Sequence, residues 1–374
     1  MIRLGDVATY INGYAFKPED RGEEGLPIIR IQDLTGNAYD LGFYNGEYPK
    51  KVEINDGDIL ISWSASLGVY IWNKGKALLN QHIFKVVFDK VDIDKNYFVY
   101  AVRQKLVEMG MKTHGATMKH IVKKDFDAML IPYPTLGEQA EIAANLNKVS
   151  SIIEVRKQEL QLLDNLIKAR FVELFGDPIK NPKGWEVVTI GDVVTEVRYG
   201  TSKPAVEGGK YPYLRMNNLT ADGHLDLNDL KYIDIPGDEI EKCVVRKGDV
   251  LFNRTNSIEL VGKTTVFDLS EDMIIAGYII RVRLNERLLP EVLSQYMNLE
   301  ALKDILRSMA KGAVNQANIN AQELQSIKVY IPDIKLQKQF VEMKEQVDKS
   351  KVAVQRALDE TQLLFDSLMQ KYFG

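Results

Sequence analysis

Cysteine is almost absent from this chain. Its 374 residues include one, Cys243, so no disulfide can form within the chain and no cysteine-based metal cage can be built. The four histidines, at positions 82, 114, 120 and 224, lack the spacing of a metal site. No apolar run approaches the roughly 18 residues of a membrane span. The first residues, Met1 to Asp6, do not resemble a signal peptide, so we expect a cytoplasmic protein that does not contact a membrane.

Motifs that carry catalysis are lacking as well. Gly262-Lys263-Thr264 matches the tail of a phosphate loop, but Ser257 stands where the first glycine of that loop belongs. Residues 181–184 (Asn-Pro-Lys-Gly) lack the second proline and the aromatic ring of an amino-methyltransferase motif. Glu342 and Lys344 mimic part of a nuclease site, but they are two residues apart on a predicted helix and therefore diverge. We predict that the chain is not an enzyme and that it binds no metal.

The chain also lacks an excess of positive charge. It has 48 Lys and Arg against 52 Asp and Glu, and a net charge of −4. Residues 1–133 hold 17 basic and 17 acidic residues, and residues 180–331 hold 19 and 21. Such a protein does not coat nucleic acid by charge alone, although a locally basic groove is compatible with these counts. Its length and its apolar content of 45% are enough for two or three domains with real cores.

Two long stretches contain neither glycine nor proline: residues 138–175 and 335–373. In the first, apolar residues recur three and four positions apart, at Ile142, Leu146, Val149, Ile153, Leu160, Leu163, Ile167 and Leu174. In the second the seam consists of Phe340, Val347, Val354, Leu358, Phe365, Leu368 and Tyr372. This spacing predicts two long amphipathic helices with coiled-coil-like seams. Because neither apolar stripe can be left in water, we expect the two helices to pack on each other.

The second stretch is a copy of the first. A constant offset of 198 residues carries Pro134 onto Pro332 and Gln139 onto Gln337, without a gap. The segments before the two helices also match, since Leu4-Gly-Asp-Val corresponds to Ile190-Gly-Asp-Val, Pro27–Thr35 to Pro212–Thr220, and Gly57–Leu60 to Gly248–Leu251. The chain is therefore a tandem duplication of a domain and a helix. Between these anchors the two domains differ strongly, which is typical of a shared scaffold with divergent loops.

The sequence predicts the class α+β: two mixed domains held apart by a pair of long antiparallel helices, with an internal pseudo-two-fold. Short β-branched and aromatic runs at 27–31, 58–63 and 82–88 predict strands, and residues 97–109 predict a helix. The first helix leads away from the first domain, so the second, packed on it, must run back. We place the mixed domains at 1–133 and 180–331, the first helix with its linker at 134–179, and the second helix at 332–374.

Several loops of both domains combine the side chains that read base edges and grip phosphates. In the first domain the candidate DNA-binding residues are Arg30, Gln32, Ser62, Trp63, Ser64, Thr113, His114, Thr117 and Lys119. In the second they are Arg215, Asn217, Asn218, Asn253, Arg254, Thr255, Asn256, Asn315 and Gln316. For any one of these residues, an ordinary polar loop is an equally good interpretation. Their occurrence as a set, in duplicated positions, favours DNA recognition.

The order and the duplication of these motifs resemble those of the specificity subunits of type I restriction-modification systems, over the full length of the chain. The motifs that carry the resemblance are Leu4–Val7 and Ile190–Val193, Gly57–Leu60 and Gly248–Leu251, Gly115–Ile121, Ile131–Gln139, Leu166–Asp177 and Asn253–Ser257. The second copy departs from the first, since Asp333–Gln337 differs from Thr135–Gln139.

The resemblance implies two target recognition domains, each reading one half of a bipartite, asymmetric site on double-stranded DNA. The helices would set the spacing and dock two methyltransferase (M) subunits, which bind S-adenosylmethionine and methylate adenine. Separate restriction or motor (R) subunits would use ATP and Mg, and this chain would bind no cofactor itself. Because the two helix starts differ, we do not expect both helices to bind their partners equally strongly.

Two other classes of function stay open. One is a coiled-coil scaffold or adaptor whose end domains bind protein, with which the mildly acidic composition is compatible. The other is a small nuclease or methyltransferase fused to a recognition domain, against which the missing motifs count. A methyltransferase gene beside the gene for this chain would favour DNA recognition.

Overall fold

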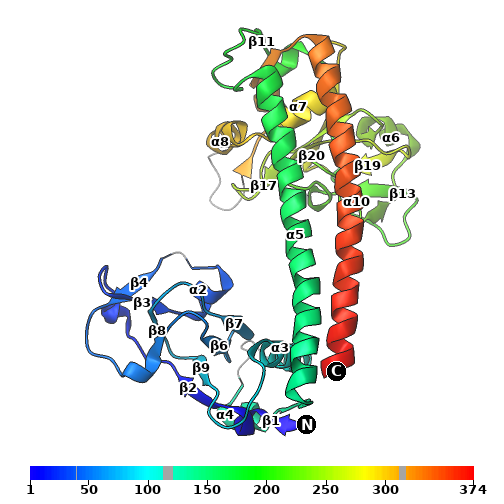
Figure 1. The fold of residues 1–374 in the computed structure, drawn as a ribbon. Coiled ribbons are helices and arrows are strands. Elements are labelled where there is room, and N and C mark those ends of the chain that lie inside the picture. The colour runs from blue at the N-terminus through cyan, green and yellow to red at the C-terminus, as the bar shows by residue number, and fades with distance from the viewer. Residues whose placement is uncertain (39, 113–120, 311–316) are drawn as a thin grey trace. The chain divides into compact units, whose positions relative to one another are not determined.

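The computed structural model describes residues 1–38, 40–112, 121–310 and 317–374, which Figure 1 colours from blue to red. The chain divides into two compact units. Unit 1 consists of residues 1–156 and 357–374, and unit 2 of residues 157–356. Each unit therefore contains one mixed domain and part of both long helices. Within the described ranges, no helix is both long and apolar enough to cross a membrane.

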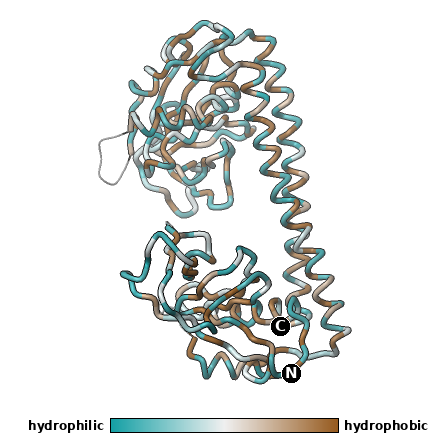
Figure 2. Tube along the Cα trace, turned by 60° about the vertical axis from the view of Figure 1, so that its left-hand side comes forward, coloured by the Kyte–Doolittle hydropathy of each residue, from teal (hydrophilic) through white to brown (hydrophobic). Residues whose placement is uncertain are grey.

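The long helices are α5 (Leu136–Phe175) and α10 (Ile334–Phe373), each of 40 residues. Figure 2 shows apolar and polar residues interspersed along both of them. Helix α5 begins at a capping interaction in which the amide of Thr135 donates to the carboxylate of Glu138 at 2.9 Å. It ends before Gly176, whose φ of 87° is a conformation that glycine adopts without strain. Both predicted helices are confirmed, at the predicted offset.

The two helices are antiparallel, as each unit shows by itself. In unit 2, Phe171 and Phe175 near the end of α5 contact Phe340 near the start of α10, with ring centroids 5.3 and 5.6 Å apart. In unit 1, Leu146 from the first half of α5 shares a core with Phe373 at the end of α10. The end of one helix thus packs beside the beginning of the other. The predicted fold class, two mixed domains with two long antiparallel helices and an internal duplication, is confirmed.

The domain of unit 1 contains two four-stranded sheets. The first has the order β2-β9-β6-β7, formed by Thr9–Asn12, Ile83–Val87, Ile59–Ser62 and Gly68–Ile71. The second has the order β4-β3-β8-β5, formed by Gly42–Tyr44, Leu26–Ile29, Ala77–Leu79 and Glu53–Ile54. A separate pair joins β1 (Ile2–Arg3) to β10 (Leu130–Ile131). The helices are α1 (Leu4–Val7), α2 (Ile31–Thr35), α3 (Lys95–Lys112) and α4 (Lys123–Ala128).

The domain of unit 2 repeats this plan. Its first sheet has the order β12-β20-β16-β18, formed by Val194–Tyr199, Ile279–Leu284, Val250–Asn253 and Thr264–Val266. Its second has the order β14-β13-β19-β15, formed by Lys231–Ile233, Tyr211–Leu214, Met273–Ile275 and Val244–Val245. Two further pairs join β11 (Glu186–Thr189) to β22 (Lys328–Ile331) and β17 (Thr255–Asn256) to β21 (Ala317–Asn318). The helices are α6 (Gly237–Cys243), α7 (Pro290–Met297), α8 (Glu300–Met309) and α9 (Ala321–Ser326).

The duplication extends to single residues. In each domain one parallel pair, β3 with β8 or β13 with β19, lies in an otherwise antiparallel sheet. A glycine follows the first strand of the first sheet in both, Gly13 after β2 and Gly200 after β12. A side chain on Gly13 would collide with the carbonyl oxygen of Asn80, and one on Gly200 with that of Ile275. The backbone crosses too closely there for any other residue.

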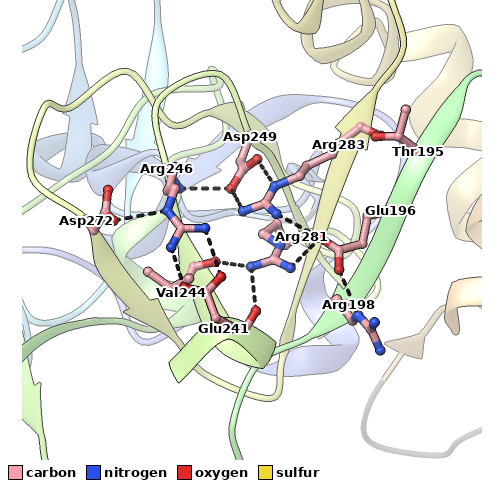
Figure 3. A network of polar contacts seen from close by, with 10 residues as sticks. All are labelled: Thr195, Glu196, Arg198, Glu241, Val244, Arg246, Asp249, Asp272, Arg281 and Arg283. Atoms are coloured by element: carbon pink, nitrogen blue, oxygen red, sulfur yellow. Dashed lines mark hydrogen bonds and ion pairs between the residues drawn. The ribbon is translucent and has the colours of Figure 1, made fainter. Parts of the chain in front are cut away.

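A cation ties the two sheets of each domain together. In unit 2, Arg281 of β20 is fully buried; it donates to the carbonyl of Val244 on β15 and to the carboxylate of Glu196 at 2.7 Å (Figure 3). Burial lowers the pKa of Arg281, although an arginine remains charged in a protein. At the equivalent strand position in unit 1, Lys85 donates to the carbonyl of Glu53 on β5 at 2.8 Å. Both cations join the first sheet to the edge strand of the second.

A buried glutamine attaches each domain to a long helix. The side-chain oxygen of Gln139 accepts from the amide of Asp94 at 3.0 Å, and its nitrogen donates to the carbonyl of Pro134 at 2.9 Å. Gln337 does the same, with Leu289 as donor and Pro332 as acceptor, both at 2.9 Å. Neither glutamine is exposed to solvent. Because buried amides are stable only when paired, each domain is fixed to the start of its helix.

We predict that Phe340→Ala destabilises unit 2 by about 3–5 kcal/mol, since Phe340 is fully buried against Phe171 and Phe175. The matched control is Val352→Ala on the same helix, where the side chain is 71% exposed and the change should stay within about 0.5 kcal/mol. Urea unfolding followed by circular dichroism measures both. Equal midpoints for the two variants would contradict the antiparallel packing.

Candidate nucleic-acid interface

Strand β6 of unit 1 ends at Ser62, and the residue after it is held by its backbone. The amide of Trp63 donates to the carbonyl of His82 at 3.2 Å, and its carbonyl accepts from the amide of Ile121 at 3.0 Å. The half-buried indole of Trp63 stacks on Phe84, with ring centroids 5.5 Å apart and planes at 23°. Both backbone groups are satisfied, so the side chain leaves the sheet at a fixed place.

Strand β16 of unit 2 ends at Asn253, and the next residue is held in the same way. The amide of Arg254 donates to the carbonyl of Tyr278 at 2.9 Å, and its carbonyl accepts from the amide of Ile319 at 2.9 Å. The half-buried guanidinium of Arg254 lies over the ring of Tyr199, 5.0 Å from the centroid. Trp63 and Arg254 therefore occupy equivalent positions, although they have different chemistry.

A surface hollow of about 570 Å³ lies beside Arg254 in unit 2. It brings together three predicted residues that are far apart in the sequence: Arg215, Asn217 and Arg254. Tyr278, half exposed, also lines it. A hollow with two guanidinium groups, an amide and an aromatic ring has the donors and the stacking surface that bases require.

The two arginines in the hollow differ in how their charge is compensated. Arg215 donates to the carboxylate of Asp229 at 2.6 Å and to its carbonyl at 2.9 Å. Arg254, in contrast, has no carboxylate partner among the described residues. The Nε atoms of both arginines are buried without a hydrogen-bond acceptor. A guanidinium that is stacked on a ring but unpaired is free to bind an anion or a base edge. We conclude that Arg254 is the group in this hollow best suited to bind a ligand.

The turn that carries Arg215 has a counterpart in unit 1. The amide of Arg215 donates to the side chain of Asn218 at 2.8 Å, as the amide of Arg30 does to Asp33 at 2.8 Å. The hydrogen bond to Asp33, together with its charge and that of Asp40, raises the pKa of Arg30, although burial opposes this. Gln32 is exposed at the start of the same turn. Arg30 and Arg215 are thus held by acidic residues of their own domain.

The family of the chain follows from comparison with known proteins. A family model described as the type I restriction modification DNA specificity domain matches residues 1–165 and 182–361. The chain belongs to this family. The predicted resemblance is confirmed, and each matched segment covers one copy of the domain together with most of its helix.

Curated relatives span the whole chain. The specificity subunits of the type I restriction enzymes EcoBI of Escherichia coli and EcoKI of Escherichia coli strain K12 are each 25% identical. These alignments cover 100% and 99% of this chain, and 85% and 87% of the relatives. The specificity subunit of enzyme MjaVIII of Methanocaldococcus jannaschii is 23% identical over 93% of this chain and 85% of its own length.

Solved structures have the same fold. The S subunit of a type I restriction-modification system from M. genitalium aligns with a TM-score of 0.56 and 15% identity, over 100% of this chain and 95% of that one. A chain from a study of complex assembly and conformational transition of the type I restriction-modification system gives 0.58 and 19%, over 100% and 96%. At these identities the likeness establishes the fold alone.

Five of the predicted residues of the specificity domains are buried: Ser62, Ser64, Asn218, Asn253 and Thr255. Four of them form side-chain hydrogen bonds inside their own domain: Ser62, Asn218, Asn253 and Thr255. The amide nitrogen of Asn253 donates to the carbonyls of Thr255 and Tyr278, both at 3.2 Å, and the hydroxyl of Thr255 donates to the side chain of Asn318 at 2.9 Å. These residues shape the loops, and their contact with DNA stays a prediction.

Seven predicted residues have not yet been placed. Asn256 is half-buried and donates to the side chain of Asn253 at 2.9 Å. Six lie outside the described residues: Thr113, His114, Thr117, Lys119, Asn315 and Gln316. Among the described residues, no group of three or more histidine, cysteine or acidic side chains could hold a metal ion.

Sequence reasoning missed two buried lysines of unit 2, one of which supports a residue that lines the hollow. Lys263, the residue before strand β18, donates to the carbonyl of Met216 at 2.8 Å and so contacts the turn that carries Arg215. Lys303 of α8 donates to the carbonyl of Gly262 at 2.6 Å and to the side chain of Asn298 at 2.9 Å. Lys263 is thus buried and bonded within the domain. The lysine of a phosphate loop would instead be available to contact a bound phosphate. Burial lowers the pKa of Lys303 to about 8, and nearby Arg307 contributes.

This depressed pKa gives a pH-dependent stability. From pH 8 towards the ordinary value of 10.5, the folded state has released the proton of Lys303 while the unfolded state still binds it. The free energy of unfolding therefore rises with pH, by at most about 1.4 kcal/mol per pH unit for this one group. Lys303→Met lacks this contribution.

We predict that the advantage in stability of the wild type over Lys303→Met grows between pH 7.5 and 9.5, measured by urea unfolding. The same substitution at the exposed Lys242 is the control and should leave the pH dependence unchanged. If the free energy of unfolding changed with pH in parallel for the wild type and Lys303→Met, burial would not lower the pKa of Lys303.

Proposed function

We propose that this chain is the DNA-specificity subunit of a type I restriction-modification complex. Each mixed domain reads one half of a bipartite, asymmetric site on double-stranded DNA, and the helices set the spacing. The observation that carries the proposal is that two units with the same topology hold different side chains at equivalent positions, Trp63 in one and Arg254 in the other. Equivalent scaffolds with different base-reading groups recognise different half-sites.

The proposed partners are two methyltransferase subunits, docked on the long helices, and restriction or motor subunits. The chemistry belongs to these partners, which hold S-adenosylmethionine, ATP and Mg, and this chain contributes no catalysis. The family membership and the specificity subunits among the relatives support this division of labour. A subunit that reads DNA for such a complex acts in the cytoplasm.

The charge of the chain fits a subunit that depends on its partners for affinity. The non-specific affinity of a protein for DNA grows with the number of phosphates that its basic residues neutralise. This chain has a net charge of −4. In the domain of unit 2, Arg215, Arg246, Arg281 and Arg283 are paired with carboxylates of the same domain. The methyltransferase subunits therefore supply much of the basic surface around the DNA. A protein-binding scaffold is the weaker candidate, because it gives no reason for the stacked and unpaired Arg254.

Co-expression with the methyltransferase subunit proposed as the partner of this chain tests the proposal. We expect methylated adenines in the host genome to lie in one bipartite motif with two different halves separated by a fixed gap. Expression of the methyltransferase alone is the control and should give no such motif. Methylation that does not depend on this chain would contradict the proposal. A continuous motif without a gap would contradict it as well.

A further inference from the structure

In each unit, the last residue of the first strand of the first sheet contacts the side chain of Trp63 or Arg254. In unit 2, Tyr199 ends β12 and its ring supports the guanidinium of Arg254. In unit 1, Asn12 ends β2 and its side-chain oxygen accepts from the indole nitrogen of Trp63 at 3.3 Å. The strand registers make the two pairs equivalent, because Asn12 lies opposite Phe84 of β9 and Tyr199 lies opposite Ile280 of β20.

The pair in unit 2 is rigid at its base. The hydroxyl of Tyr199 accepts from the amide of Ala321, the first residue of α9, at 2.7 Å. This bond fixes the ring on which the guanidinium of Arg254 rests. The backbone of Arg254 is fixed by Tyr278 and Ile319. A side chain that is held at its backbone and along its face loses little entropy on binding, which favours specific recognition over a loose phosphate contact.

We propose that these two pairs, Asn12 with Trp63 and Tyr199 with Arg254, determine one base in each half-site. In the half read by unit 2, the guanidinium of Arg254 donates hydrogen bonds to O6 and N7 of a guanine. Tyr199 is a positioning residue, since it acts on the base only through Arg254. In the half read by unit 1, Trp63 presents an apolar ring and reads its base by contact with a thymine methyl group. This assignment rests on the proposed function of the chain.

The chemistry of the two side chains carries the assignment. A guanidinium has parallel donors whose spacing matches the two acceptors of guanine in the major groove, and this is the commonest specific contact to a base. The only donor of an indole is its ring nitrogen, and in Trp63 that group is already engaged by Asn12. Trp63 therefore cannot reproduce the guanine contact, although its backbone is held as that of Arg254 is. The same scaffold position thus has different base preferences in the two units.

The test is genome-wide adenine methylation by the complete complex with its methyltransferase. We expect Arg254→Ala to lose the preference for guanine at one position of one half-site, by on the order of 10- to 100-fold. Tyr199→Ala should lose preference at the same position, and Tyr199→Phe, which keeps the ring, should retain most of it. Trp63→Ala should relax a position in the other half only. Arg198→Ala, an exposed arginine of the same strand that is paired with Glu196, is the matched control and should leave the motif unchanged.

Each outcome decides the proposal. A wild-type complex that gives no bipartite motif overturns the proposed function, whereas a bipartite motif that Arg254→Ala leaves unchanged overturns this inference alone. If a variant methylates nothing, the purified variant complex is titrated with duplexes that carry each of the four bases at every position of the half-site. Loss of the guanine preference at one position supports the assignment, and a preference equal to that of the wild type contradicts it. Retention of the preference in Tyr199→Ala would show that Tyr199 does not position Arg254.

Discussion

The packing of α5 against α10 is the interaction on which the rest of the structure depends. Neither unit has a complete core without both helices. Unit 1 uses Leu146 of α5 together with Phe373 of α10, and unit 2 uses Phe171 and Phe175 with Phe340. Because the apolar stripes of both helices are buried in this way, each domain is joined to a common pair of helices. The buried glutamines, Gln139 and Gln337, then fix each domain to the start of its own helix.

Backbone hydrogen bonds explain how two domains with different residues keep one scaffold. Each buried amide and carbonyl needs a partner whatever the side chain is, so the pattern of partners survives changes of side chain. The amides of Trp63 and Arg254 have equivalent acceptors, and so do those of Gly13 and Gly200. The cation that joins the sheets is a lysine in one domain and an arginine in the other, Lys85 and Arg281, and each donates to an equivalent carbonyl. The scaffold thus leaves the side chains at the ends of the strands free to differ.

Much of the fold could be predicted from the sequence, because its strongest signals are periodic and repeated. The apolar residues of the long helices are spaced three and four apart, and residues 138–175 and 335–373 contain no glycine or proline that would end the helices early. The predicted strand run at 27–31 overlaps β3, and the runs at 58–63 and 82–88 include β6 and β9. The predicted helix at 97–109 lies inside α3. The offset of 198 residues then predicted the second helix from the first.

The candidate interface was harder to predict, because polar composition alone does not separate a side chain that faces DNA from one that supports a loop. Asn253 and Arg254 are neighbours, yet the first is buried and paired inside the domain and the second lines the hollow. Alternation along the strand could have separated them. Nothing in the sequence indicates that Tyr199, 55 positions before Arg254, would support its guanidinium, because that contact depends on the pairing of β12 with β20 and of β20 with β16.

The central claim is that two equivalent domains read two half-sites independently. The most direct test is a chain in which residues 182–331 replace residues 1–133, so that both positions carry the domain of unit 2. Its methylation motif, measured with the same methyltransferase, should become an inverted repeat of one half-site, because the same domain would then read both halves and would precede each of the two antiparallel helices. A motif that keeps the half-site assigned to unit 1, or that stays asymmetric, would contradict the account.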